Sequence, residues 1–425
     1  MENQTHDQNT EPEIPEQNPG LRARLFKPAV IAAATIAAAA CICLVIALLF
    51  SPAEDTSASG KKPAPSEQAL AEQNSTETAQ PILYEEPQEN DMDDLVKQVD
   101  LALITALKKA DISMSELRLE DVSIKKHQGR DFHFQQLSFP CKGDKQEFVA
   151  SIRKGLEDSS LNASIHETSP ESWLISVNGV PTHRFSLFTP VTTPIPAPTK
   201  PDPNAPKMAI VIDDMGEDLT LAKGLAALDV HVSFSIWPNS SQVQKTIDIA
   251  RKHGNEIMIH LPMQPKGYPK VNPGPDALLV GMSEAQIRDK VLAAVSKVPG
   301  ARGLNNHMGS KFTEDLNGMN TVMSQLKKEK IYFLDSRTTP DSAAPKAAKS
   351  AGVKIYERSI FLDNVKNVAA IKFQLSKTAE LARKRGQAIA IGHPHRETLK
   401  AIRQWAAENK GKVNIVPVEK LKPVS

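Results

Sequence analysis

The chain has 425 residues, enough for roughly two or three domains. It carries 51 Lys and Arg against 50 Asp and Glu, a formal net charge of +1 that lacks the basic excess of a nucleic-acid-binding protein. Aromatic residues make up 5% of the chain, which argues against broad platforms for stacking sugars. We therefore expect no nucleic-acid partner.

Residues 1–27 are polar, with several acids and prolines, and this composition predicts a disordered cytoplasmic tail. Residues 28–50 form an apolar run without a charged side chain, long enough to cross a bilayer. Basic residues precede the run and acidic residues follow it: Arg22, Arg24 and Lys27 before, and Glu54 and Asp55 after. This asymmetry predicts a single-pass transmembrane helix in the inner (cytoplasmic) membrane, with the remainder of the chain on the periplasmic side.

Two other interpretations of residues 28–50 stay open, a cleaved signal peptide and a buried core helix. The long polar lead-in and the lack of a small-x-small cleavage site favour an uncleaved anchor. Cysteine usage agrees with export, because Cys41 and Cys43 lie inside the run and Cys141 stands alone beyond it. Outside the run, the sequence therefore allows neither an intrachain disulfide nor a thiolate zinc site.

Two predicted linkers frame a small module at residues 91–188. Residues 51–90 are rich in Ser, Ala, Pro, Glu and Gln, and residues 189–206 are dense in Pro and Thr. Within the module a strand is predicted near residues 132–139, and a hairpin is predicted around Asn178-Gly179. Apolar residues at helical spacing predict two helices, through Leu95, Val99, Leu103 and Leu107 and through Phe148, Ile152 and Leu156. We expect an α+β module, and contact with an envelope protein partner is our hypothesis for its role.

From residue 207 to residue 425 apolar strands alternate with amphipathic helices, which predicts a parallel sheet that is either open or closed into a barrel. Strands are predicted at residues 208–212, 231–236, 256–259, 303–304, 331–334, 353–355, 388–391 and 413–415. Helices are predicted between them at residues 219–228, 242–253, 284–298, 317–328, 343–351, 368–385 and 396–409.

Polar side chains with metal-binding or catalytic chemistry follow several of these strands. Because parallel strands present their carboxyl ends at one face, we expect these residues to converge there. The residues are Asp213 and Asp214 after the first strand, His260 after the third, Asn305, Asn306 and His307 after the fourth, Asp335 after the fifth and His393 after the seventh. Two adjacent carboxylates at the edge of a core need a cation or a proton to relieve them, although an Asp in this place can also cap the next helix.

The segment from residue 208 to about residue 416 resembles the polysaccharide deacetylases with a NodB-like barrel, and most closely the divergent polysaccharide deacetylase family. Its motifs are Val-Ile-Asp-Asp-Met-Gly at 211–216, Gly-Asn-Glu-Ile-Met-Ile-His at 254–260, Leu-Asn-Asn-His-Met-Gly-Ser at 304–310, Phe-Leu-Asp-Ser at 333–336 and Ile-Ala-Ile-Gly-His at 389–393. His-Leu-Pro-Met-Gln at 260–264 and His-Met-Gly-Ser at 307–310 are specific to the divergent branch.

The resemblance implies a distorted (β/α) barrel, a divalent cation such as zinc held by one Asp and two His, and deacetylation of an N-acetylated cell-envelope polysaccharide. Carried over by motif position, the resemblance implies that Asp213 is the general base, that Asp214 and His260 are metal ligands, and that His393 is the general acid. The ordinary family has a second histidine four positions after the first, where this chain has Gln264. We therefore expect His307 to supply the third ligand.

Three further residues are expected to contact the glycan, namely Asn306, Asp335 and Trp237. For Asp335 the orientation of His393 is a second interpretation, and for Trp237 ordinary packing is an equally good one. A catalytically weak or inactive barrel that serves as an envelope binding or scaffold protein is the alternative to a hydrolase. It rests on Gln264, on the membrane tether and on the extra module. A phosphate-binding enzyme has little support, because Gly216 stands alone without a Gly-rich loop.

Overall fold

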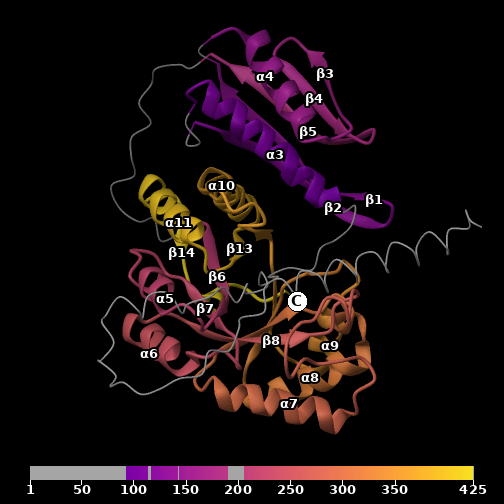
Figure 1. The fold of residues 1–425 in the computed structure, drawn as a ribbon, viewed down its shortest axis with the longest axis vertical. Helices are drawn as coiled ribbons and strands as arrows, with labels where there is room; N and C mark the ends of the chain where they lie inside the picture. Colours follow the sequence, from indigo (N-terminus) through magenta and orange to yellow (C-terminus); the bar gives the residue numbers. More distant parts are fainter. Residues whose placement is uncertain (1–91, 113–115, 142, 190–204, 425) are drawn as a thin grey trace, which may run out of the picture. The chain divides into compact units, whose positions relative to one another are not determined.

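A computed structural model of the protein describes residues 92–112, 116–141, 143–189 and 205–424, all within one compact unit, Gln80–Ser425. The predicted tail, the apolar run at residues 28–50 and the predicted linker at residues 51–90 lie outside the described residues. Within the described ranges, no helix is both long and apolar enough to span a membrane. The described residues form two sheets with their helices (Figure 1).

The first sheet belongs to the predicted α+β module. Its strand order is β1-β2-β5-β4-β3, with β2 and β5 parallel and the other described pairs antiparallel. Asn178 and Gly179 both have positive φ, as expected for the turn of the predicted hairpin between β4 and β5. The elements are α3 (Met92–Lys109), β1 (Arg118–His127), β2 (Arg130–Pro140), α4 (Lys145–Asp158), β3 (Ala163–Ser169), β4 (Ser172–Val177) and β5 (Val180–Phe188).

The second sheet is parallel throughout its described strand pairs and has the order β11-β10-β9-β8-β7-β6-β13-β12, with β14 beside β6. Its strands are β6 (Lys207–Met215), β7 (Ser233–Ile236), β8 (Ile257–Met263), β9 (Gly303–Met308), β10 (Tyr332–Asp335), β11 (Ile355–Glu357), β12 (Ile360–Phe361), β13 (Gln387–Gly392) and β14 (Asn414–Ile415). Its helices are α5 (Leu219–Ala226), α6 (Val243–His253), α7 (Glu284–Lys297), α8 (Leu316–Glu329), α9 (Ala344–Ala351), α10 (Val368–Arg385) and α11 (Arg396–Glu408).

The predicted barrel is observed as a half-barrel of parallel strands with helices, in which β11 and β12 end the described strand order. The short chain between these two strands passes from one end of the sheet to the other. Arg358 donates its backbone N–H to Asp335 on β10, and Ser359 donates its own to Ile389 on β13. Strand β13 pairs along β6, so the first and last long strands of the sheet lie side by side.

Local sequence explains where these elements begin and end. Strand β8 is buried at every position, as expected for a parallel strand covered on both faces. Ser283 and Gln286 form a capping box at the start of α7, and Asn367 caps α10. Gly254 and Gly386 end α6 and α10 in the left-handed conformation.

Helix α3 of the module packs against α10 through a buried polar cluster centred on Asp100. Its carboxylate lies 3.2 Å from Nζ of Lys377 and accepts from Nε2 of Gln374 at 3.1 Å, and it lies 3.0 Å from Nε2 of His183. Burial would raise the pKa of Asp100, but Lys377 and His183 lower it below its ordinary value. The charge is therefore retained where the two helices meet.

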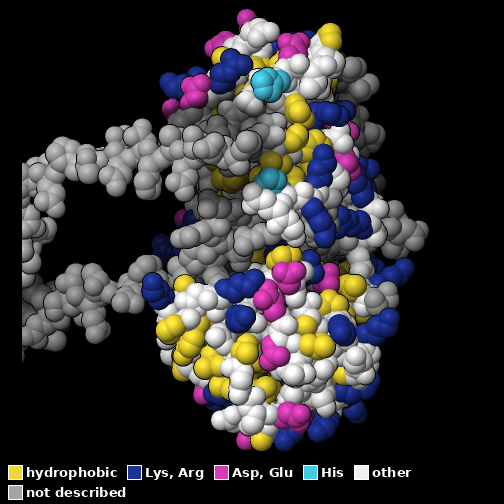
Figure 2. All heavy atoms as spheres, turned by 90° about the vertical axis from the view of Figure 1, so that its right-hand side faces the viewer, with side chains coloured by type: hydrophobic (Ala, Val, Ile, Leu, Met, Phe, Trp, Pro, Cys, Tyr) yellow, Lys and Arg dark blue, Asp and Glu magenta, His cyan; other side chains and the backbone are white. Residues whose placement is uncertain are grey.

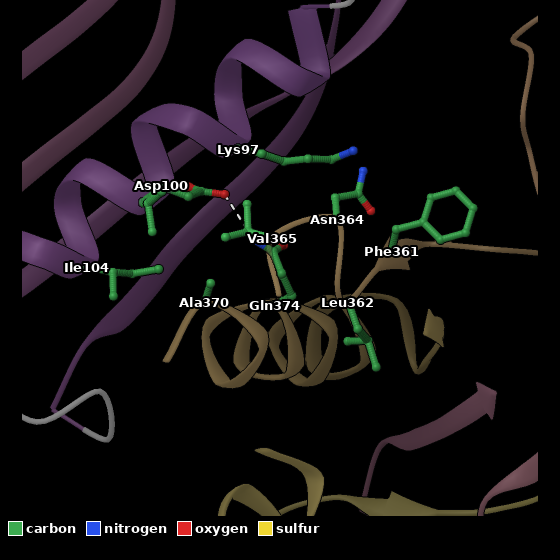
Figure 3. A pocket seen from close by; sticks show the side chains of 10 residues that line it. Lys97, Asp100, Ile104, Phe361, Leu362, Asn364, Val365, Ala370 and Gln374 are labelled. Carbon is green, nitrogen blue, oxygen red and sulfur yellow. Dashed lines mark hydrogen bonds between the residues drawn. The ribbon is translucent and has the colours of Figure 1, made fainter. Parts of the chain in front are cut away.

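Beside this cluster, a small pocket lies between α3 and the chain that leads into α10 (Figure 3). Lys97, Asp100 and Ile104 line it from α3, and Asn364 and Val365 face them from the other side. On the face shown in Figure 2, acidic and basic side chains are interspersed over the lower part of the view, in keeping with the near-zero net charge of the sequence.

Candidate metal centre

The end of β6 turns two consecutive carboxylates into the protein interior. Asp213 is 2% exposed and Asp214 is 5% exposed. Asp214 has a φ of 50°, and the pairing of β6 with β7 shifts register between Ile212 and Met215. Such a bulge re-aims side chains, and left-handed backbone in a non-glycine residue is typical of functional sites. At Gly216, where φ is 130°, an added Cβ would meet Oγ of Ser240 at 1.9 Å, so this bulge requires glycine.

The helix-cap interpretation of the two carboxylates is wrong, because another residue caps helix α5. Asp218 accepts the backbone N–H groups of Thr220 and Leu221 at 2.7 and 2.9 Å. The side chains of Asp213 and Asp214 are therefore not used as caps of this helix and are buried in the protein interior.

Three predicted ligands, Asp214, His260 and His307, converge from β6, β8 and β9. Oδ1 of Asp214 lies 3.1 Å from Nε2 of His260 and 3.1 Å from Nδ1 of His307, and the two nitrogens lie 3.2 Å apart. One ligand atom from each of the three residues falls within 4.8 Å of the others, and all three side chains are buried. The three side chains therefore surround one common point.

The charges at this point fit a divalent cation. Among the described residues, neither carboxylate oxygen of Asp214 has an aligned hydrogen-bond donor, although both are buried. Burial would raise the pKa of Asp214, but His307 and His260 lower it well below its ordinary value, so it stays ionised. A buried carboxylate without a donor, facing two imidazole nitrogens, matches the N and O donors of three-ligand zinc sites.

Asp213 lies beside the three ligands in a different environment. Its two oxygens accept from Nδ2 of Asn305 at 2.8 and 3.0 Å, and Oδ2 lies 3.7 Å from Nδ1 of His260. Burial raises the pKa of Asp213 above its ordinary value, against the opposing charges of His260 and His393. The pKa values of the two adjacent carboxylates therefore differ: Asp214 stays ionised, whereas Asp213 is more basic than usual. Such a difference is the usual sign of separate roles.

His393, at the end of β13, is held by Asp363, a residue that the sequence did not single out. Nδ1 of His393 lies 2.9 Å from Oδ1 of Asp363, whose Oδ2 accepts the backbone N–H of His393 and the hydroxyl of Thr398. Burial would raise the pKa of Asp363, but His393 lowers it. A signal was present in the sequence, because Ile-Phe-Leu-Asp at 360–363 ends in an acid, as the first strand does.

The remaining predicted site residues are engaged with the protein itself. Trp237 lies against the ring of His307, with centroids 5.4 Å apart, and its indole Nε1 is buried without an acceptor in the described part of the chain. The amide of Asn306 donates to the carbonyl of Met308 and accepts the N–H of Ser336. Their predicted contact with a glycan stays a prediction.

Asp335 and Gln264 are likewise held by neighbouring backbone. Asp335 is fully buried and accepts the N–H of Arg337 at 2.8 Å. The side-chain oxygen Oε1 of Gln264 accepts the backbone N–H of Val280 at 2.7 Å, and the backbone carbonyl of Gln264 accepts two further backbone N–H groups. The side chain at the position of the family's second histidine therefore fastens the loop that follows β8.

A comparison with models of protein families supports the resemblance that the strand-end motifs indicate. Residues 210–422 match the family model for divergent polysaccharide deacetylase. The chain belongs to the divergent polysaccharide deacetylase family. The resemblance inferred from the motifs is thereby confirmed, and every predicted ligand lies within the matched residues.

Two bacterial proteins and one solved structure are similar to this member of the family. The chain is 40% identical over 200 residues to the uncharacterized protein YibQ of Escherichia coli K12, covering 47% of this chain and 62% of that relative. An uncharacterized protein of Haemophilus influenzae Rd is 41% identical over 193 residues, covering 45% of this chain and 68% of that relative. The crystal structure of the uncharacterized protein ATU2773 from Agrobacterium tumefaciens C58 matches at 28% identity with a TM-score of 0.49, over 52% of this chain and 90% of that one. The match thus covers less than two thirds of the E. coli relative.

Proposed function

We propose that residues 207–425 form a metal-dependent, deacetylase-like hydrolase that acts on N-acetylated cell-envelope polysaccharide. The observation that carries this proposal is the convergence of Asp214, His260 and His307 on one point beside Asp213. These three residues would hold a divalent cation, for which zinc suits two imidazoles and a carboxylate. When bound, the cation would acidify a water and polarise the acetamide carbonyl.

The residues around this point suit amide hydrolysis. Asp213 would take the proton of the attacking water, and the burial that raises its pKa makes it a stronger base than an exposed Asp. His393 would donate a proton to the departing amine. Asp363 would hold Nδ1–H of His393 and stabilise the charged ring, since its own carboxylate stays ionised.

The proposed setting of this activity rests on the sequence. We propose that residues 28–50 anchor the chain in the inner membrane, that the hydrolase domain lies on the periplasmic side, and that residues 91–188 contact an envelope protein. An N-acetylated glycan of the envelope would then be within reach of the hydrolase domain.

The test is acetate release by the full chain from chitin oligomers and peptidoglycan fragments, with zinc supplied or withheld by a chelator. We expect zinc-dependent acetate release that Asp213→Asn abolishes while zinc binding persists. Absence of acetate with every divalent metal tried, together with wild-type behaviour of Asp213→Asn, would overturn the proposal.

The alternative is a weak or inactive domain that serves as an envelope binding or scaffold protein. It is favoured by Gln264, because the amide at the family's second histidine position is taken by Val280. It predicts a protein partner whose capture depends on residues 91–188 and is unchanged by His260→Ala. Capture of the same partner by an active, zinc-loaded enzyme would instead assign the module a targeting role.

A further inference from the structure

We infer that Asn305 is a positioning residue that makes Nε2 of His260 the metal-binding nitrogen and at the same time holds Asp213. This inference rests on the proposed function of the Asp214–His260–His307 group. Asn305 is fully buried on β9 and is the register partner of His260 on β8. It therefore lies between a proposed ligand and the proposed base.

The orientation of the Asn305 amide follows from its neighbours. Its Nδ2 lies 2.8 and 3.0 Å from the two oxygens of Asp213, and a carboxylate can only accept. The NH₂ group must therefore face Asp213. Its second N–H points to Oγ of Ser336 at 3.3 Å, whose own proton is donated to the carbonyl of Asn306.

The carbonyl of Asn305 is consequently directed at His260. Oδ1 lies 2.9 Å from Nδ1 of His260 and also receives the hydroxyl of Ser235. An amide oxygen can only accept, so Nδ1 of His260 carries a proton in either charge state of the ring. In the neutral ring Nε2 is then left with its lone pair, and this nitrogen is the one that faces Asp214 and His307.

The amide of Asn305 has both an acceptor for His260 and a donor for Asp213 on one short side chain. An Asp at position 305 would still accept from His260 and Ser235, but it could not donate to Asp213 and would place a second charge beside it. A Leu would offer neither function. The two substitutions therefore separate the part of Asn305 that orients the ligand from the part that holds the base.

The experiment compares the full chain with Asn305→Asp and Asn305→Leu by three measurements. Nitrogen-15 NMR of labelled histidines reports the tautomer of His260 in the metal-free chain at alkaline pH, where the ring is neutral. Competition with a chromogenic chelator gives the zinc affinity, and acetate release gives kcat. His260→Ala identifies the His260 resonance.

We expect the Nδ1–H tautomer in the wild type and in Asn305→Asp, and a mixture of tautomers in Asn305→Leu. Zinc affinity should fall by about 10- to 100-fold in Asn305→Leu, the usual loss when the partner of a ligand histidine is removed. Asn305→Asp should keep its zinc affinity and lose about 100-fold or more in kcat, because the base loses its donor.

A wild-type His260 in the Nε2–H form would overturn the inference, and so would equal zinc affinities for Asn305→Leu and the wild type. The tautomer measurement needs neither zinc nor turnover. A chain that binds no zinc would therefore refute the proposed function, while the NMR result would still decide the role of Asn305.

Discussion

Nδ1 of His307 lies 3.1 Å from Oδ1 of Asp214. His307 belongs to β9, the next strand along the chain after β8, which carries His260 at the family's first ligand position. The amide of Gln264 is meanwhile engaged by Val280. In our proposal the third ligand therefore comes from the end of β9 and not from the turn after β8. Because β8 and β9 are parallel neighbours, the side chain of His307 lies at the same face as that of His260.

This relationship predicts different effects on zinc affinity for two substitutions. His307→Ala should lower zinc affinity by at least about 100-fold, since it removes a ligand and not merely the partner of one. Gln264→Ala is the matched control, and it should leave zinc affinity within a few-fold while lowering the melting temperature through the loosened loop. Chelator competition and thermal unfolding give the two readouts. A Gln264→Ala chain that loses zinc as His307→Ala does would show that Gln264 is itself a ligand.

The Asp363–His393 pair gives a second prediction. In Asp363→Asn the residue keeps its size but loses the charge that stabilises the protonated ring, so we expect kcat for acetate release to fall by about 100-fold or more with little change in zinc affinity. Thr398→Val removes only a donor to Asp363 and should cost far less. Wild-type kcat in Asp363→Asn would mean that His393 does not act as the acid.

The sequence predicted the helices of residues 207–425 within a few residues, because their caps and apolar spacing are local signals. It shortened β9 to Gly303 and Leu304, whereas the strand continues through Asn305 to Met308. By hydropathy, a buried strand that carries polar side chains cannot be distinguished from a loop. Such side chains can be buried because they form hydrogen bonds with residues that are distant in the sequence. Strand β12 was missed because it contains only Ile360 and Phe361.

The same reason explains which site residues could be predicted. Strand-end position placed Asp214, His260 and His307 among the candidate site residues, and the resemblance to the family then singled out these three as ligands. Asn305 and Asp363 act through partners, namely Asp213 and His393, that are remote in sequence. No local pattern encodes such a pairing, and only the folded arrangement reveals it.

The buried cluster between α3 and α10 predicts that the module and residues 207–425 stabilise each other. Lys377→Met leaves the carboxylate of Asp100 buried without its cation, and loss of one partner of such a pair typically costs about 3–5 kcal/mol. Adding Asp100→Asn should restore part of this loss, because the uncompensated charge is gone. Urea unfolding of the full chain measures all three variants. A double variant that is less stable than Lys377→Met would show that the charge of Asp100 is not the source of the loss.

Asp213 provides the last prediction, on stability against pH in the metal-free chain. Burial raises its pKa above the ordinary value of 3.8. A group with a raised pKa in the folded state contributes stability below its unfolded pKa, and that contribution is lost as the pH rises through the folded pKa. At pH 7 the ionised carboxylate is therefore a cost of folding, and Asp213→Asn removes it.

We accordingly expect the metal-free Asp213→Asn chain to melt a few degrees above the wild type at pH 7, with the difference shrinking toward pH 4. Thermal unfolding at the two pH values with a chelator present measures it. Since the same change should abolish acetate release, the carboxylate would be one that is retained for chemistry at the expense of stability. A variant that melts below the wild type at pH 7 would instead make Asp213 a stabilising partner of His260.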